Sequence, residues 1–126
     1  MEHVAGHLFP QPLVGRSDGS SVLLDEVIGQ GFALILRQDA PSLPNLRELG
    51  DRVPFTIVTF GSTPGPGVVG DPSGALHKWF RREEVDFVLI RPDRYVYDAG
   101  RANQLEAVLQ AFVAALPAGE RAGVAA

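Results

Sequence analysis

The chain has 126 residues, of which 45% are apolar and 21% are charged, and its formal net charge is −4. This length and composition suit one globular domain that folds without a disulfide or a metal. The acidic balance and the lack of a dense basic patch exclude nucleic acid and a membrane surface as partners, and the absence of cysteine excludes disulfides, thiolate metal sites and dithiol redox chemistry.

The apolar runs and the N-terminus indicate a soluble cytoplasmic protein. No apolar run approaches the roughly 20 residues that span a bilayer. The first residues, Met1 to Val4, lack the positive start and the apolar stretch of a signal peptide. We therefore expect neither a membrane span nor secretion.

The N-terminal third predicts an extended arm, a short helix and a strand. Residues 1–20 form the arm, because the prolines in this segment disfavour helix for the residues that precede them. Residues 21–28 predict a helix, with Ser21 as its cap and Gly29 at its end. Residues 31–36 are a nearly unbroken apolar run, which is typical of a strand covered on both faces.

Two helices and a second strand follow along the chain. Residues 41–50 predict a helix with leucines three residues apart, and residues 54–60 predict a strand rich in β-branched and aromatic side chains. After a loop rich in glycine and proline over residues 61–70, Asp71 and Pro72 suit the start of a helix. The buried face of that helix is expected to contain Leu76, Trp79 and Phe80.

A hairpin and a final helix complete the predicted elements. Residues 86–91 and 95–98 predict strands joined by a tight turn, since a Pro–Asp centre suits such a turn. Asn103 is the expected cap of the last helix, with Glu106 three residues later, and residues 117–126 predict a disordered tail. The apolar stripe of the last helix is Leu105, Val108, Leu109, Phe112 and Leu116.

The order of these elements predicts the fold class. It is α/β, with the order β-α-β-α-β-β-α after an N-terminal extended arm. The first β-α-β unit requires parallel strands and a right-handed crossover, and the hairpin adds an antiparallel pair. This is the connectivity of a thioredoxin-like sandwich, here without a Cys-x-x-Cys motif. We therefore expect an arm over 1–20, a thioredoxin-like domain over 21–116 and a disordered tail over 117–126.

No pattern in the sequence predicts a catalytic or cofactor-binding residue. In thioredoxins the redox cysteines open the helix after the first core strand, and the equivalent turn here runs from Asp39 to Ser42. These two side chains cannot form a disulfide and have no visible base or partner. Residues 65–70 match the letters Gly-x-Gly-x-x-Gly. However, four residues lie between the preceding strand and this segment, and Asp71-Pro72 lies between this segment and the next helix. A surface loop is therefore favoured over a dinucleotide-binding turn.

The histidines and adjacent carboxylates are likewise expected to have no catalytic or metal-binding role. His3 and His7 are four residues apart, but their segment is not expected to be helical and no His-Glu-x-x-His pattern is present. His77 follows Ser73 by four residues without a Gly-x-Ser-x-Gly elbow, which indicates a solvated helix residue. Neighbours in a helix point about 100° apart, so two acidic pairs are interpreted as surface charges. These pairs are Asp25–Glu26 and Glu83–Glu84.

Two stretches resemble a known enzyme family. Gly6-His-Leu-Phe-Pro-Gln-Pro-Leu-Val14, followed by residues 22–36, is similar to the opening of the C-terminal domain in flavoprotein monooxygenases. The nearest type is 3-(3-hydroxyphenyl)propionate hydroxylase, in a group that includes phenol hydroxylase-like enzymes. Residues 85–97 are similar to the family's Leu-Val-Arg-Pro-Asp-Gly-Tyr-Val hairpin. The resemblance covers about residues 5–115.

The resemblance implies a function through a parent enzyme. Such enzymes use FAD and NAD(P)H to insert one oxygen atom of O2 into a phenolic ring, and their flavin and substrate sites would lie in a larger N-terminal part. The family's catalytic residues then have no positions here, and we expect this chain to bind neither FAD nor NAD(P)H. Arg94 departs from the family's glycine, so the turn is expected to differ in type. A structural role in the turn is expected for Arg91, Pro92 and Asp93.

Two hypotheses about function follow. In the first, the chain is the non-catalytic C-terminal structural and subunit-contact domain of an FAD- and NAD(P)H-dependent aromatic-ring monooxygenase. Its partners are then the N-terminal FAD and substrate part of that enzyme and a second copy. In the second, it is a free-standing, redox-dead thioredoxin-like interaction module. The arm, with Leu8, Phe9, Leu13 and Val14, either docks or self-associates through exposed apolar surface, or caps the edge of its own core.

Overall fold

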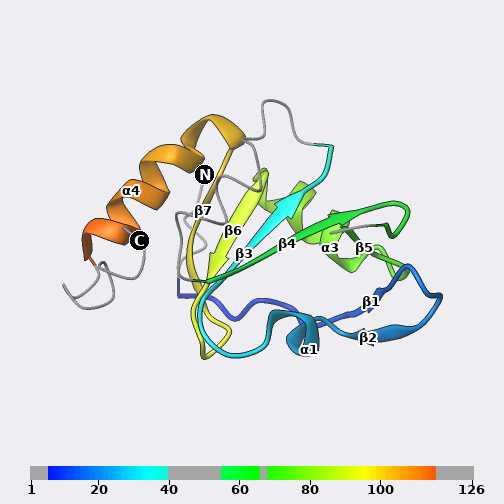
Figure 1. Cartoon of the computed structure of the whole chain (residues 1–126). Coiled ribbons are helices and arrows are strands. Elements are labelled where there is room, and N and C mark those ends of the chain that lie inside the picture. Colours follow the sequence, from blue (N-terminus) through cyan, green and yellow to red (C-terminus); the bar gives the residue numbers. More distant parts are fainter. Residues whose placement is uncertain (1–5, 40–54, 66–67, 116–126) are drawn as a thin grey trace.

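The computed structural model describes residues 6–39, 55–65 and 68–115, with one sheet and helices against it (Figure 1). The strands are β1 (Leu13–Gly15), β2 (Ser21–Leu23), β3 (Ala33–Arg37), β4 (Thr56–Gly61), β5 (Val68–Gly70), β6 (Phe87–Ile90) and β7 (Val96–Gly100). The helices are α1 (Leu24–Ile28), α3 (Ala75–Glu83), the short 3-10 helix η1 (Ala102–Gln104) and α4 (Leu105–Ala115). Within the described ranges the strand order is β2-β1-β5-β4-β3-β6-β7.

The centre of the sheet has the predicted connectivity. Strand β3 pairs in parallel with β4 and antiparallel with β6, and β6 pairs antiparallel with β7. The predicted helix over 41–50 and the predicted tail over 117–126 lie outside the described residues, as does Leu116. The predicted α/β order is therefore confirmed for the elements that the structure describes.

Both faces of the sheet are covered, as the apolar run over residues 31–36 predicts. Side chains alternate along β3, so Ala33 and Ile35 face one apolar layer while Leu34 and Leu36 face the other. Figure 1 shows α4 on one side of β3, apart from α1 and α3. The first layer receives Leu24, Ile28, Leu76, Trp79 and Phe80 from α1 and α3, and the second receives Leu105, Leu109 and Phe112 from α4.

The N-terminal segment is part of the sheet, which corrects two predictions. Ser21 does not cap a helix; it begins β2, and α1 starts three residues later at Leu24. The segment predicted as a separate extended arm over residues 1–20 instead contributes β1, which lies between β2 and β5. Val14 pairs with Val22 and is 0% exposed. Burial of this apolar side chain together with backbone pairing favours a strand over a peripheral arm.

Helix α3 begins later than the sequence predicts. It starts at Ala75, because Gly74 has left-handed backbone with φ of 75° and cannot continue a helix. Asp71 therefore precedes the helix by one turn, and its carbonyl accepts the N–H of Gly74 at 2.9 Å. The predicted buried face of α3 is nevertheless confirmed.

The last helix also has a different start. The helical residues begin at Ala102, so Asn103 is not the cap that the sequence predicts. The N–H of Ala102 donates to the carboxylate of Asp86 at 2.9 Å, and the N–H of Arg101 donates to Oε1 of Gln104 at 2.8 Å. The carboxylate of Asp86, which lies just before β6, thus supplies the acceptor that a local Asn would otherwise provide.

The turn between β6 and β7 holds Arg94 in left-handed backbone. The N–H of Arg94 donates to the carbonyl of Arg91 at 2.9 Å, and the φ of Arg94 is 72°. Its side chain donates to the carboxylate of Asp25 and to the carbonyl of Gly29, at the end of α1. Arg94 thus occupies the backbone region that favours glycine. Its contacts with α1 offset the steric cost of a Cβ there.

Two substitutions of Arg94 separate this backbone cost from the side-chain contacts. Both Arg94→Ala and Arg94→Gly remove the contacts, but only Arg94→Ala keeps a Cβ at positive φ. The left-handed region costs a non-glycine residue about 1–2 kcal/mol. Against this, glycine lowers the stability of the fold by about 0.4–1 kcal/mol relative to alanine, because the unfolded chain gains conformational freedom. We therefore expect Arg94→Gly to be the more stable variant by about 0.5–1 kcal/mol in urea denaturation. Equal stabilities would contradict this account.

Candidate functional site

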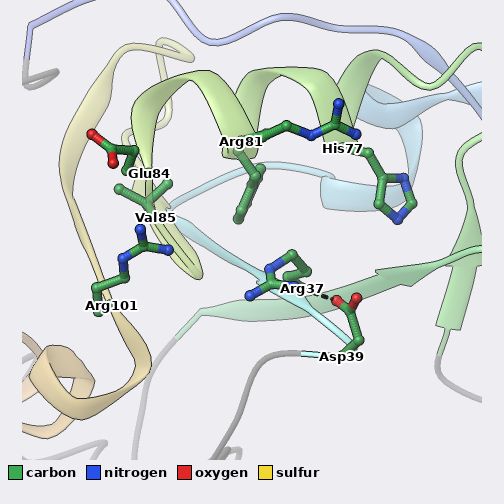
Figure 2. A pocket seen from close by; sticks show the side chains of 8 residues that line it. Arg37, Asp39, His77, Arg81, Glu84, Val85 and Arg101 are labelled. Atoms are coloured by element: carbon green, nitrogen blue, oxygen red, sulfur yellow. Dashed lines mark hydrogen bonds and ion pairs between the residues drawn. The ribbon is translucent and has the colours of Figure 1, made fainter.

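A pocket of about 430 Å³ lies where β3 ends, next to α3 (Figure 2). Ligands of α/β sheets commonly bind at this carboxyl end of the strands. The turn predicted to correspond to the thioredoxin redox motif begins here, since Asp39 lines the pocket, while Ser42 lies outside the described residues. The lining residues are Arg37, Asp39, His77, Phe80, Arg81, Glu84, Val85 and Arg101.

A buried carboxylate anchors two of the pocket's arginines. Asp86 lies just before β6, and its side chain is 4% exposed. Its Oδ1 accepts a hydrogen bond from Nη2 of Arg37 at 2.5 Å and lies 3.7 Å from Nη1 of Arg101. Its Oδ2 accepts the N–H of Ala102 at 2.9 Å. Asp86 therefore joins the end of β3 to the start of the last helix.

The surroundings of Asp86 keep it ionised. Burial raises the pKa of this carboxyl, but the hydrogen bonds from Arg37 and Ala102 and the charges of Arg37 and Arg101 outweigh burial. Its pKa consequently lies below its ordinary value. The hydrogen bond to Asp86 in turn raises the pKa of Arg37 above its ordinary value. Both groups are therefore charged at neutral pH.

Beyond Asp86, the arginines of the pocket have few partners among the described residues. Nη1 of Arg37 donates to the carboxylate of Asp39 at 2.7 Å, and the Asp39 side chain is 72% exposed. Arg81 forms no ion pair with any residue of the described ranges. Figure 2 shows Arg81 on α3, across the pocket from Arg37 and Asp39, with Arg101 at the end near Glu84. Planar guanidinium groups that come from different elements suit the recognition of an oxyanion.

His77 is bound to a buried carboxylate and is not the solvated residue that the sequence predicts. Oδ2 of Asp71 accepts the backbone N–H and the Nδ1–H of His77, each at 2.8 Å. The Asp71 side chain is 0% exposed and that of His77 is 29% exposed. This contact with the buried carboxylate fixes the orientation of the imidazole ring. Ser73 instead accepts the N–H of Ala75 at 3.3 Å, at the start of α3.

The remaining titratable groups of the described ranges form no metal site. No group of three His, Asp or Glu side chains in these ranges could hold an ion. His3 lies outside them, and the carbonyl of His7 accepts the N–H of Val96 at 2.8 Å. The acidic pairs lie at the surface, with Asp25, Glu26 and Glu84 exposed and Glu83 half-buried.

Within the segment over residues 65–70, the structure describes a strand inside the sheet. Residues 68–70 form β5, which pairs with β4, and Gly70 also pairs with Gly15 of β1. The predicted surface loop is therefore wrong for these residues, because sheet pairing satisfies their backbone groups. Strand β5 precedes α3 by four residues, Asp71 to Gly74, and not by a tight glycine turn. The described residues thus do not fit the turn that holds the pyrophosphate of FAD or NAD(P)H.

Two cross-strand pairs of apolar side chains are exposed along the N-terminal segment. Leu13 pairs with Leu23 across β1 and β2, and the two residues are 51% and 47% exposed. Leu8 pairs with Tyr95 in an isolated bridge, and they are 62% and 41% exposed. Phe9, by contrast, is 1% exposed and packs in the first apolar layer. This segment therefore both fills the core and presents apolar surface to the outside.

The polar residues of the β6–β7 turn contact one another. Nη2 of Arg91 donates to Oδ2 of Asp93 at 2.7 Å, and Oδ1 of Asp93 accepts the N–H of Tyr95 at 3.2 Å. These hydrogen bonds stay within the turn, which agrees with a structural role.

Sequence patterns did not single out Arg37, Asp86 or Arg101. Arg37 ends the buried strand β3, and Asp86 immediately precedes the buried strand β6. Antiparallel pairing brings the end of one such strand beside the start of the other. Opposite charges at those two positions are the signal that could have identified the pair. Arg101 carries no such signal, because its place depends on where β7 ends.

Comparisons with known proteins find one family model and several relatives. Residues 6–115 match the model of the HcaD C-terminal domain. The chain is 34% identical over 125 residues to a 3-(3-hydroxy-phenyl)propionate/3-hydroxycinnamic acid hydroxylase of Mycobacterium sp. (strain JLS). That match covers 89% of this chain and 22% of the enzyme. The chain thus spans about a fifth of the length of this curated relative.

Solved structures with the same fold include a thiol-disulfide oxidoreductase and a monooxygenase. The thioredoxin domain of the oxidoreductase, from Bacteroides vulgatus, matches with a TM-score of 0.58 and 15% identity, over 88% of this chain and 99% of that one. The flavin-dependent monooxygenase PieE matches with a TM-score of 0.57 and 21% identity, over 85% of this chain and 19% of that one. These matches confirm the thioredoxin-like fold. None of the helices in the described ranges has the length and apolarity to cross a bilayer.

Proposed function

The chain belongs to the HcaD C-terminal domain family, and from that membership we propose that it is the non-catalytic C-terminal domain of an aromatic-ring hydroxylase. The parent enzyme uses FAD and NAD(P)H and acts on phenolic substrates such as 3-(3-hydroxyphenyl)propionate. The observation that carries this proposal is the share of length: the family model spans residues 6–115, yet the match covers only 22% of the hydroxylase relative. The flavin and substrate sites then belong to the rest of the enzyme.

The chemistry of this chain supports that division. It has no cysteine, so the thioredoxin-like fold has no thiol to exchange. Its described residues do not fit a dinucleotide-binding turn, and the described lining of the β3 pocket has no nucleophile beside a base. We therefore assign FAD and NAD(P)H to the N-terminal part and a structural role, in the cytoplasm, to this domain.

The partners we propose are the N-terminal catalytic part and a second copy of the enzyme. Strand β2 is an edge of the sheet, and Leu23 on it lies beside Leu13 with about half of each residue exposed. An edge strand with apolar side chains and unpaired backbone groups favours contact with another chain or domain. The proposed contact surface is therefore the exposed pair Leu13–Leu23.

The reading frame upstream of residue 1 in the source genome tests the proposal directly. A domain of a hydroxylase requires a continuous frame that encodes a strand, a Gly-x-Gly-x-x-Gly turn and a helix, followed by the family's Gly-Asp flavin motif. A stop codon shortly upstream in the same frame would overturn the proposal and favour a free-standing interaction module.

Sedimentation of the isolated chain tests the contact surface. We expect the wild type to self-associate in the micromolar range, because the apolar pair Leu13–Leu23 has no partner domain to cover it. The double variant Leu13→Lys/Leu23→Glu should sediment as a monomer, because burial of charged side chains in a contact is unfavourable, while opposite charges remain compatible with pairing of β1 and β2. Its circular dichroism should match the wild type, because both positions are exposed. A wild type that is monomeric throughout this range would argue against the surface.

A further inference from the structure

We propose that the arginine pocket at the end of β3 binds a small free oxyanion, a phosphate or a carboxylate, which is a role beyond the structural function above. Three guanidinium groups from three parts of the fold line the pocket: Arg37 from β3, Arg81 from α3, and Arg101 from the connection between β7 and η1. Guanidinium groups stay charged at all physiological pH values and bind such anions through two parallel N–H donors.

The chain itself places a carboxylate in this pocket. Asp39 accepts a hydrogen bond from Nη1 of Arg37 at 2.7 Å, although its side chain is 72% exposed. The buried Asp86 holds Arg37 in position, because its carboxylate accepts a hydrogen bond from Nη2 of Arg37. An exposed ion pair such as Arg37–Asp39 contributes little and exchanges readily. A free anion can therefore take the place of the Asp39 carboxylate on a preorganised guanidinium.

Among the described residues, Arg81 and Arg101 keep donors without a partner. Arg81 forms no ion pair among the described residues, and Arg101 lies 3.7 Å from Asp86, which is longer than a hydrogen bond. The lining holds three arginines against two carboxylates, Asp39 and Glu84. Asp86 does not compete with a ligand, because it is buried and already accepts from Arg37 and from the last helix.

His77 completes the side of the pocket formed by α3. Its Nδ1 is bound to the fully buried Asp71, so the imidazole ring is held in one orientation at the edge of the pocket. Figure 2 shows His77 on the same side as Arg81, facing the end of β3. The pocket thus combines the guanidinium donors of Arg81 on α3 with those of Arg37 on β3.

Titration of the whole chain with inorganic phosphate, followed by NMR amide shifts at constant ionic strength, tests this site. We expect saturable shifts around the pocket. Arg81→Gln and Arg101→Gln should each weaken binding about tenfold, because each removes a charge-assisted hydrogen bond. Asp39→Asn should strengthen binding several-fold, since it removes the competing carboxylate. A parallel titration with acetate distinguishes a phosphate site from a carboxylate site, and saturation by neither anion would overturn the proposal.

Arg82→Gln is the matched control for charge. Arg82 neighbours Arg81 on α3, but it pairs with Glu83 at 2.9 Å and does not line this pocket. Its loss should leave phosphate binding unchanged. If Arg82→Gln weakened binding as much as Arg81→Gln, the shifts would reflect general charge screening and the site would be rejected.

Discussion

Replacing Asp86 by alanine is expected to lower the free energy of unfolding by about 2–4 kcal/mol. The variant leaves Arg37, whose side chain is 24% exposed, without its buried partner, and the N–H of Ala102 without its acceptor. Removal of one member of a buried pair costs about 3–5 kcal/mol, and residual water contact of the arginine reduces this value. Urea denaturation followed by the fluorescence of Trp79, the single tryptophan, measures the loss.

The matched control for Asp86 is the other carboxylate bound to Arg37. Asp39 is 72% exposed, so Asp39→Ala should change the free energy of unfolding by no more than about 0.5 kcal/mol. Equal losses of unfolding free energy in the two variants would contradict the larger contribution that we assign to the buried Asp86.

The pH dependence of stability provides a second measurement on Asp86. Its pKa is lowered in the folded state, so its contribution is complete above the unfolded value of about 4 and is lost as the pH falls through the folded value. We expect the stability difference between wild type and Asp86→Asn to be constant at neutral pH and to shrink below about pH 4. A difference that grew on acidification would contradict the assignment.

Phe9→Ala is expected to cost about 3–5 kcal/mol. Phe9 is 1% exposed and meets the ring of Trp79 edge-on, with 4.7 Å between the ring centroids. Truncation would therefore leave a cavity between the N-terminal segment and α3. The same denaturation experiment measures the cost, and Phe9→Asp should prevent folding because it would bury an unpaired charge.

Leu8 provides the control for Phe9, since it is adjacent in sequence but 62% exposed. Leu8→Ala should change stability by about 0.5 kcal/mol or less. If Phe9→Ala kept full stability and altered only the sedimentation of the chain, the core role of Phe9 would be rejected. The segment would then serve association alone.

Local patterns in the sequence were sufficient for the central strands and for the buried faces of α3 and α4. The apolar runs that became β3 and β6 are covered on both faces, and such strands need no partner-specific information to be recognised. The Pro–Asp turn likewise carries its own conformational preference. The absence of cysteine and the resemblance over nearly the whole chain pointed to a thioredoxin-like domain without thiol chemistry.

Only the tertiary structure decided the N-terminal strands and the charged cluster. Serine has a local preference for the cap of a helix, but Ser21 pairs with Gly15 across β1 and β2. The strand pairing and the burial of Val14 outweigh that preference. Asp86 and Arg37 are 49 residues apart, and the partner that sets the start of the last helix lies 16 residues before Ala102. Local propensity carries no information about such contacts, because they exist only once antiparallel pairing of β6 with β3 and with β7 brings these residues together.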